Sequence, residues 1–363
     1  MTSRLSFETV LVTGGAGYVG AVLVPRLLRR GYRVRVVDLY VFAADPLRAV
    51  ADHPRLEQIR GDIRDADLMC RAFAGVDAVI HLACVSNDPS CELDPALSRS
   101  INYDAFEPLL NDSRAAGVQR FIFASSSSIY GVSDVPDVTE EHPLRPLTVY
   151  NTLKGMCETV LFRHQAPDFT TVAIRPATLC GRSPRQRLDL TVNILTAQAI
   201  ERGHITVFGG SQQRPNLHIE DMVDLYELLL QVPAELIAGE AFNAGCQNRS
   251  VAEIANVVKA VVEANMPARS PVTIETTASN DPRSYHISSA KIRQRLGFVP
   301  QRTIEDAIRD LIAAFEAGAL PNAIGDDQYY NVRAMKKVLG ELLTLDAGHS
   351  RGAPPERTDG STL

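Results

Sequence analysis

The stretch Val10-Leu-Val-Thr-Gly-Gly-Ala-Gly-Tyr-Val-Gly20 indicates the fold class of this chain. It joins a short apolar run to a glycine-rich turn, and residues with helical character follow as far as Arg30. In this order Gly14 permits a tight turn, Gly17 lets backbone N–H groups approach a pyrophosphate, and Gly20 lets helix and strand pack closely. The helix start then favours an anion. The alternative is an ordinary strand–turn–helix whose glycines serve geometry alone.

Short β-branched runs alternate with helical patterns through the first half of the chain, which predicts a parallel sheet covered on both faces. Pro108 predicts a kink or break in the longest of these helices. We expect strands over 7–13, 33–38, 56–61, 78–83 and 121–125, and helices over 18–30, 65–74, 95–116, 148–164, 191–202 and 219–231.

The predicted fold is therefore α/β, a Rossmann-like doubly wound parallel sheet with a smaller C-terminal substrate-binding lobe. We assign residues 1–175 to the NAD-binding domain and residues 176–345 mainly to the lobe, with some of its segments returning to the first domain. Residues 346–363 are polar and contain Gly, Pro and Ser, which predicts a disordered tail.

The composition excludes several classes of partner. The chain has 363 residues and a net charge of −6, without a basic block, so no nucleic-acid partner is expected. It lacks an apolar span of membrane length, so no membrane helix is expected. Its six cysteines form no CxxC pair, which favours reduced, buried thiols in a cytoplasmic protein over a disulfide framework. No metal site is expected.

Two carboxylates follow predicted strands. Asp38 ends the second strand, where it can accept hydrogen bonds from the adenosine ribose and repel a 2′-phosphate, so NAD is favoured over NADP. Asp62 follows the third strand and can contact adenine. The alternative for Asp38 is an ordinary turn residue at a strand end.

Tyr150 and Lys154 lie four residues apart on a predicted helix and therefore share a face. A tyrosine needs its pKa lowered by about three units to act as a base near neutral pH, worth about 4 kcal/mol. One ammonium at about 4 Å supplies a similar amount at an effective dielectric constant of about 20. The spacing alone also fits an exposed helical pair. The run Ser125 to Ser128 follows a strand at the ligand-binding edge of the sheet, where its hydroxyls can meet a substrate oxygen; a polar loop is the alternative.

Together these motifs resemble the extended short-chain dehydrogenases/reductases of the NAD-dependent nucleotide-sugar epimerase/dehydratase family. The resemblance spans roughly Val10 to Leu320. Besides the glycine turn and the Tyr150–Lys154 pair, it is carried by Val79-Ile-His-Leu-Ala83, Phe123-Ala-Ser-Ser-Ser-Ser-Ile-Tyr-Gly131 and His218-Ile-Glu-Asp221.

The resemblance implies roles for individual positions. It implies Ser126, Tyr150 and Lys154 as catalytic residues, with Lys154 also binding the cofactor ribose. It implies that NAD is bound by Gly14, Gly17, Tyr18, Val19, Asp38, Asp62, Ile63, Leu82, Ala83, Asn102, Tyr150 and Lys154. It implies a nucleotide-diphosphate sugar contacted by Ser126, Ser127, Thr178, Phe208, Arg214 and Arg283, the two arginines at its diphosphate; either arginine alone also fits a solvated surface charge. The polar loop after the fourth strand adds Ser86 and Asn87 as candidate sugar contacts. Relatives are often homodimers, so a homodimer is expected.

The residues after Ser126 favour one reaction. The family's 4,6-dehydratases typically carry an Asp-Glu pair there, whereas this chain has Ser127 and Ser128. Their hydroxyls are poor proton donors and acceptors at neutral pH, which favours epimerisation at C4 through a transient 4-keto sugar. A 4-ketoreductase, a 4,6-dehydratase and a non-catalytic NAD sensor remain as alternatives. The segment 327–333 has no role in this interpretation.

Overall fold

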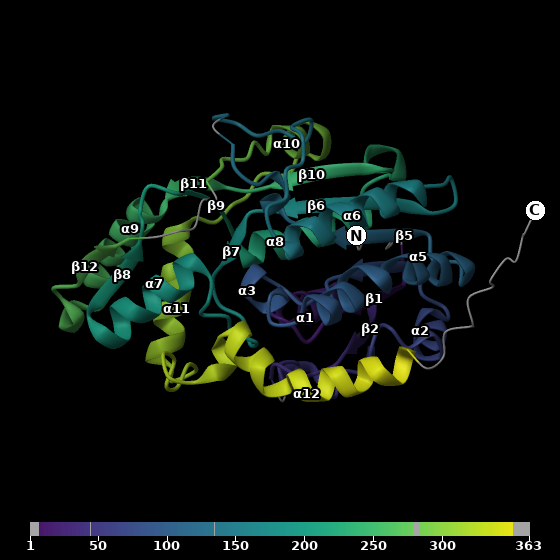
Figure 1. The fold of residues 1–363 in the computed structure, drawn as a ribbon, viewed down its shortest axis with the longest axis horizontal. Coiled ribbons are helices and arrows are strands. Elements are labelled where there is room, and N and C mark those ends of the chain that lie inside the picture. Colours follow the sequence, from purple (N-terminus) through teal and green to yellow (C-terminus); the bar gives the residue numbers. More distant parts are fainter. Residues whose placement is uncertain (1–6, 44, 134, 279–283, 351–363) are drawn as a thin grey trace, which may run out of the picture.

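The computed structural model describes residues 7–43, 45–133, 135–278 and 284–350. Its largest sheet consists of β1 (Thr9–Thr13), β2 (Arg33–Asp38), β3 (Leu56–Arg60), β4 (Ala78–His81), β5 (Arg120–Ala124), β6 (Thr170–Pro176) and β10 (Glu240–Ala244). These strands are all parallel and lie in the order β10-β6-β5-β4-β1-β2-β3 (Figure 1). The order reverses between β1 and β4, and doubly wound sheets bind ligands at the carboxyl ends of such strands. The predicted α/β fold with a doubly wound parallel sheet is confirmed.

The central strands are buried on both faces. Val10, Leu11 and Val12 of β1 have no exposed surface, and Val12 pairs with Val36 of β2 and Ile80 of β4. Because both faces are covered, these strands are continuous apolar runs rather than alternating ones. That continuity is the reason the sequence pattern could locate them.

Two helical layers cover the sheet. On one face α1 (Gly20–Arg30), α8 (Ile219–Gln231) and α10 (Ala290–Leu296) contribute to one apolar cluster. On the other face α2 (Ala66–Phe73), α5 (Phe106–Ala115), α6 (Val149–Arg163) and α12 (Asn331–Ser350) contribute to a second cluster. In Figure 1 α12 is the long yellow helix at the lower edge, near β2 and α2. Short helices α3 (Asp88–Cys91) and α4 (Pro95–Arg99) follow β4.

The smaller lobe has a core of its own, to which three helices and the strands β7 (Thr178–Cys180) and β8 (His204–Phe208) contribute buried residues. The lobe also contains β9 (Gln213–His218), β11 (Gln247–Ser250) and β12 (Thr273–Thr277), and the three helices are α7 (Thr191–Arg202), α9 (Val251–Asn265) and α11 (Ile304–Glu316). Its strands form two small sheets, β11-β9-β7 and β12-β8. Since α8, β10, α10 and α12 lie with the large sheet, the chain beyond residue 176 contributes to both parts.

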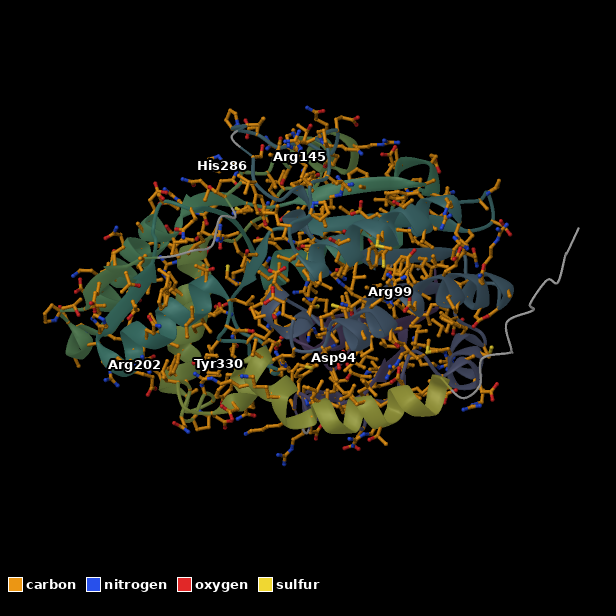
Figure 2. All side chains as sticks on the ribbon, viewed as in Figure 1. Asp94, Arg99, Arg145, Arg202, His286 and Tyr330 are labelled. Carbon is orange, nitrogen blue, oxygen red and sulfur yellow. The ribbon has the colours of Figure 1, made fainter. Side chains whose placement is uncertain are left out.

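Two segments differ from the sequence prediction. The helix expected over 95–116 is divided into α4 and α5 by a π-helical turn at Ser100–Asp104, and Pro108 lies in the first turn of α5, where its missing N–H removes no helical hydrogen bond. The disordered tail expected over 346–363 is wrong for its first residues, because α12 continues to Ser350; residues 351–363 lie outside the described part of the chain. In Figure 2 Tyr330 lies where the small lobe leads into α12.

No helix within the described ranges is both long enough and apolar enough to cross a bilayer.

Candidate active site

A cavity of about 540 Å³ opens at the carboxyl ends of the central strands, between the sheet and the smaller lobe. It brings together most of the residues that the sequence singled out, although they come from segments far apart in the chain. Those lining it are Gly14, Gly17, Tyr18, Val19, Gly20, Asp38, Asp62, Ile63, Leu82, Ala83, Ser86, Asn87, Ser126, Ser127, Tyr150, Lys154, Thr178 and Arg214.

The glycine turn has the geometry that its sequence predicts. Gly14 has a φ of 73°, and a Cβ there would lie 2.6 Å from the backbone nitrogen of Ala83 at the end of β4. A Cβ on Gly20 would lie 2.5 Å from backbone atoms of Gly15. The first glycine therefore lets two strand ends meet, and the last lets α1 start against the turn.

Asp38 holds the turn through its carboxylate. One oxygen accepts from the backbone N–H of Ala16 at 2.9 Å and the other from that of Tyr40 at 2.8 Å. Burial raises the pKa of Asp38, while these N–H groups oppose the rise. Asp62 also lines the cavity, but its carboxylate is paired with Arg64, at 2.6 Å, and both side chains are 5% exposed. An adenine contact by Asp62 must therefore compete with this ion pair.

Two predicted site residues do not line the cavity, and a third lies outside the described residues. Asn102 is buried behind the cavity wall, where its side chain accepts from Val85 N at 2.8 Å and donates to Val85 O at 3.0 Å. It shapes the loop after β4 and is not among the residues that line the cavity. Phe208 ends β8, is 61% exposed and does not line the cavity either. Arg283 lies outside the described residues.

Tyr150 and Lys154 share the cavity face of α6, whose first turn is capped by Thr148. The Lys154 ammonium donates to the carbonyl of Ala124 at 2.6 Å and lies 5.8 Å from the centre of the Tyr150 ring. Burial raises the pKa of Tyr150 well above its ordinary value, and neighbouring acidic groups, Asp88 among them, add to the rise. Burial therefore opposes the effect expected from Lys154, and the spacing of the two residues along the helix carries no information about burial.

The serine run forms a hydrogen-bonded turn directly after β5. The Ser126 hydroxyl lies 2.7 Å from that of Ser128, which in turn donates to the side-chain oxygen of Asn151 on α6. The Ser127 hydroxyl is buried and lies 3.5 Å from that of Tyr285. The structure thus places Ser126 and Ser127 on the cavity wall and ties Ser128 to the helix that carries Tyr150.

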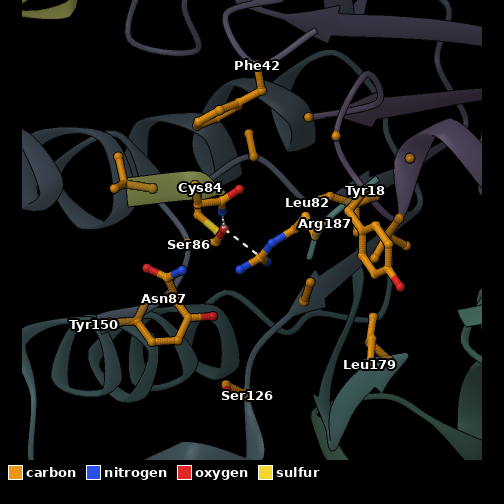
Figure 3. A pocket seen from close by; sticks show the side chains of 18 of the residues that line it. Tyr18, Phe42, Leu82, Cys84, Ser86, Asn87, Ser126, Tyr150, Leu179 and Arg187 are labelled. Atoms are coloured by element: carbon orange, nitrogen blue, oxygen red, sulfur yellow. Dashed lines mark hydrogen bonds between the residues drawn. The ribbon is translucent and has the colours of Figure 1, made fainter. Parts of the chain in front are cut away.

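A polar network that the sequence interpretation missed lines part of the cavity. Arg185, Arg187 and Asp189 follow β7, and Asn331 begins α12. Figure 3 shows the Arg187 guanidinium between Tyr18 and the Ser86 hydroxyl, which it approaches at 3.5 Å. The sequence left the segment 327–333 without a role, and nothing in it placed that segment beside the loop after β7.

Comparison with known proteins extends these observations. The family model described as the NAD dependent epimerase/dehydratase family matches residues 10–245. A UDP-glucose 4-epimerase of Lactobacillus helveticus is 28% identical over 82% of this chain and 94% of its own length. A 3 beta-hydroxysteroid dehydrogenase/Delta 5→4-isomerase of Mycobacterium tuberculosis is 34% identical, but over 64% of this chain and 63% of its own. A crystal structure of DesIV, a dTDP-glucose 4,6-dehydratase from Streptomyces venezuelae with NAD and TYD bound, is 26% identical, covers 86% of this chain and 98% of DesIV, and superposes with a TM-score of 0.76. The chain belongs to the NAD dependent epimerase/dehydratase family.

Proposed function

We propose that this protein is an NAD-dependent epimerase that inverts C4 of a nucleotide-diphosphate sugar. The matches to enzymes of nucleotide sugars extend over 82% and 86% of this chain, whereas the match to the steroid dehydrogenase covers 64%. The greater extent of the first two matches supports a nucleotide sugar over a steroid.

The cavity fits NAD. The first turn of α1 lines it, and helix N-termini carry unsatisfied N–H donors that suit a pyrophosphate. Asp38 stands at the end of β2, where a carboxylate suits the ribose of NAD and disfavours the 2′-phosphate of NADP. When bound, NAD⁺ supplies the hydride acceptor and, later, the hydride donor.

The chain's own residues supply the proton chemistry. Tyr150 takes the proton of the C4 hydroxyl and returns it after the 4-keto sugar has turned over. Burial raises the pKa of Tyr150, and a further positive charge alongside would lower it again and so favour the role of this phenol as a base. Ser126 hydrogen-bonds the C4 oxygen, and Lys154 is held by Ala124 O beside the Tyr150 ring. Such preorganised donors need little rearrangement as charge develops.

The observation that carries the choice of epimerisation is the chemistry next to Ser126. Ser127 and Ser128 take the places where dehydratases of the family typically carry Asp and Glu, and both hydroxyls have partners. Asp88, which also lines the cavity and lies close enough to Tyr150 to affect its pKa, accepts a hydrogen bond from Thr148. Elimination of water needs an acid and a base beside the sugar, and this arrangement supplies neither at that point.

The test is to incubate the protein and NAD⁺ with a panel of nucleotide sugars and to follow the products by NMR. We expect a C4-inverted sugar with no net consumption of NAD. Recovery of a 4-keto-6-deoxy sugar instead would establish a 4,6-dehydratase and refute the proposal. Stoichiometric oxidation of added NADH by a 4-keto substrate, with no inverted product, would point to a ketoreductase.

A further inference from the structure

The loop between β7 and α7 is fastened directly to the glycine turn. The Tyr18 hydroxyl donates to Gly181 O at 2.7 Å, and the Ser183 hydroxyl donates to Tyr18 O at 2.7 Å. Asn193 donates to both the Tyr18 hydroxyl, at 3.1 Å, and the carbonyl of Arg187, at 2.8 Å. Residues of this loop therefore keep a fixed position relative to the turn.

Arg185 brings a buried positive charge to the cavity from this loop. Its side chain lines the cavity, the residue is 2% exposed, and its guanidinium carbon lies 4.7 Å from the centre of the Phe42 ring. One terminal nitrogen donates to the side-chain oxygen of Asn331 at 2.6 Å, but Nε is buried and has no hydrogen-bond partner among the described residues. Burial lowers the pKa of Arg185 to about 9. A buried charge without a directly bonded counter-ion is costly, and an anionic ligand would offset that cost.

Arg187 offers a second guanidinium with donors to spare. Its Nε and one terminal nitrogen bind Asp189 at 2.9 and 3.1 Å, and its other terminal nitrogen approaches Ser86 at 3.5 Å. A guanidinium has five N–H donors in a planar fork. Because Nε and one terminal nitrogen of Arg187 face Asp189, N–H donors of the terminal nitrogens remain for a ligand in the cavity. Figure 3 shows the Arg187 guanidinium there.

Asn331, at the start of α12, holds Arg185 and also binds the two residues that contact Arg187. Asn331 accepts from Arg185, donates from its side chain to Ser86 at 2.8 Å, and donates from its backbone to Asp189 at 3.2 Å. Asn87 completes the set by donating to the same Asp189 oxygen at 3.0 Å. Loop, β4 edge and α12 are thus joined around the two guanidinium groups.

We propose that Arg185 and Arg187 form a second anion subsite, which binds the pyrophosphate of NAD from the side opposite the glycine turn, with Asn331 as its positioning residue. The proposal rests on NAD as the cofactor, but not on the reaction at C4. The attachments to Tyr18 and the position of Arg185 over Phe42, just beyond Asp38, favour the cofactor's phosphates over those of the sugar nucleotide. Two forked donors from one loop suit the paired oxygens of a diphosphate.

The test is calorimetric titration of the cofactor-free full chain with NAD⁺, ADP-ribose, adenosine and UDP. ADP-ribose keeps the pyrophosphate without the nicotinamide, adenosine lacks the pyrophosphate, and UDP stands for the substrate's diphosphate. We expect Arg185→Gln and Arg187→Gln each to lower the affinity for NAD⁺ and for ADP-ribose about tenfold or more, because each removes a charge-assisted interaction. Adenosine should bind all variants as it binds the wild type.

Arg182→Gln is the matched control, since Arg182 lies in the same loop and is exposed. It should leave every titration unchanged. The positioning role of Asn331 predicts that Asn331→Ala lowers the affinity for ADP-ribose and does not change the affinity for adenosine. If a glutamine variant fails to fold, Arg185→Lys and Arg187→Lys retain the charge and remove the fork, and each should still weaken ADP-ribose severalfold.

Three results would overturn the proposal. One is unchanged affinity for ADP-ribose in folded Arg185 and Arg187 variants, whether Gln or Lys. Another is an equal loss for adenosine, which would make the arginines structural. The third is a loss confined to UDP, which would assign the subsite to the substrate. None of these outcomes depends on turnover, so failure here is distinct from failure of the epimerase assignment.

Discussion

Replacing Gly20 with alanine tests the contact that joins α1 to the glycine turn. The added Cβ would lie 2.5 Å from Cα, C and O of Gly15. Carbon atoms in ordinary contact are about 3.5–4.0 Å apart, so the helix start and the turn must separate by about 1 Å. All three obstructing atoms are backbone, and no side chain can rotate to make room.

We therefore expect Gly20→Ala to lower the free energy of unfolding by about 2–3 kcal/mol, the upper part of the range for overpacked sites. Gly155→Ala is the matched control. Gly155 lies inside α6, where a Cβ would meet only Leu144 Cδ1, at 3.9 Å. Alanine is the better helix former, so this variant should be more stable than the wild type by about 0.5–1 kcal/mol.

Urea denaturation of the cofactor-free proteins at pH 7 measures both changes. Titration with NAD⁺ should also show a larger Kd for Gly20→Ala, because the first turn of α1 moves away from the pyrophosphate. If Gly20→Ala matched the wild type in stability and in affinity, the close approach of helix and turn would not be a real constraint. A destabilised Gly155→Ala would show that the space around Gly155 cannot accept a methyl group.

Four other outcomes are expected. Tyr150→Phe should lose turnover by orders of magnitude and still bind NAD⁺; near-wild-type turnover would remove the phenol from the mechanism. NAD⁺ should bind far more tightly than NADP⁺ by calorimetry, and Asp38→Ala should narrow the gap; tighter binding of NADP⁺ would contradict the role of Asp38. Burial lowers the pKa of His81 to about 3, below the unfolded value of about 6.5, so the free energy of unfolding should fall as the pH drops from 6.5 toward 3. Urea denaturation should give a free energy of unfolding about 2 kcal/mol lower at pH 5 than at pH 7 because of this residue. The His81→Asn variant should not show this difference. Glu158→Gln should cost about 3–5 kcal/mol because it leaves the buried Arg175, which Glu158 binds at 2.6 Å, without its counter-ion; a change under 1 kcal/mol in thermal unfolding would count against this.

Local patterns located β1 to β5 of the large sheet, but β6 and β10 were not predicted. The strand predicted over 33–38 is β2 (Arg33–Asp38) without change, because its β-branched Val34, Val36 and Val37 are buried and its ends are polar. The glycine turn and the pair on α6 were also visible, since their spacing reflects geometry inside one element. The sequence also predicted that Ser126 and Tyr150 lie near each other, and both line the cavity. Ser126 follows β5, and Tyr150 lies on the cavity face of α6.

The remaining features depend on contacts between distant segments. Asn331 reaches Ser86 across 245 positions, and no periodicity in either segment encodes that meeting. The return of β10 to the large sheet follows from its pairing with β6; the sequence predicted that some later segments return, but not which ones. The raised pKa of Tyr150 has the same origin, because it arises from the packing of several segments around the phenol.

The position of Asn331 also bears on the order of events during synthesis. The last strand of the large sheet ends at Ala244, so a nascent chain can complete that sheet long before the ribosome adds the residue that binds Ser86 and Asp189. Until then, Arg185 lacks its hydrogen bond to Asn331. The anion subsite that we propose for the dinucleotide is therefore incomplete. We therefore expect lasting capture of NAD to begin only after residue 331 has left the exit tunnel, with the closing helix, rather than the sheet, setting the moment of loading.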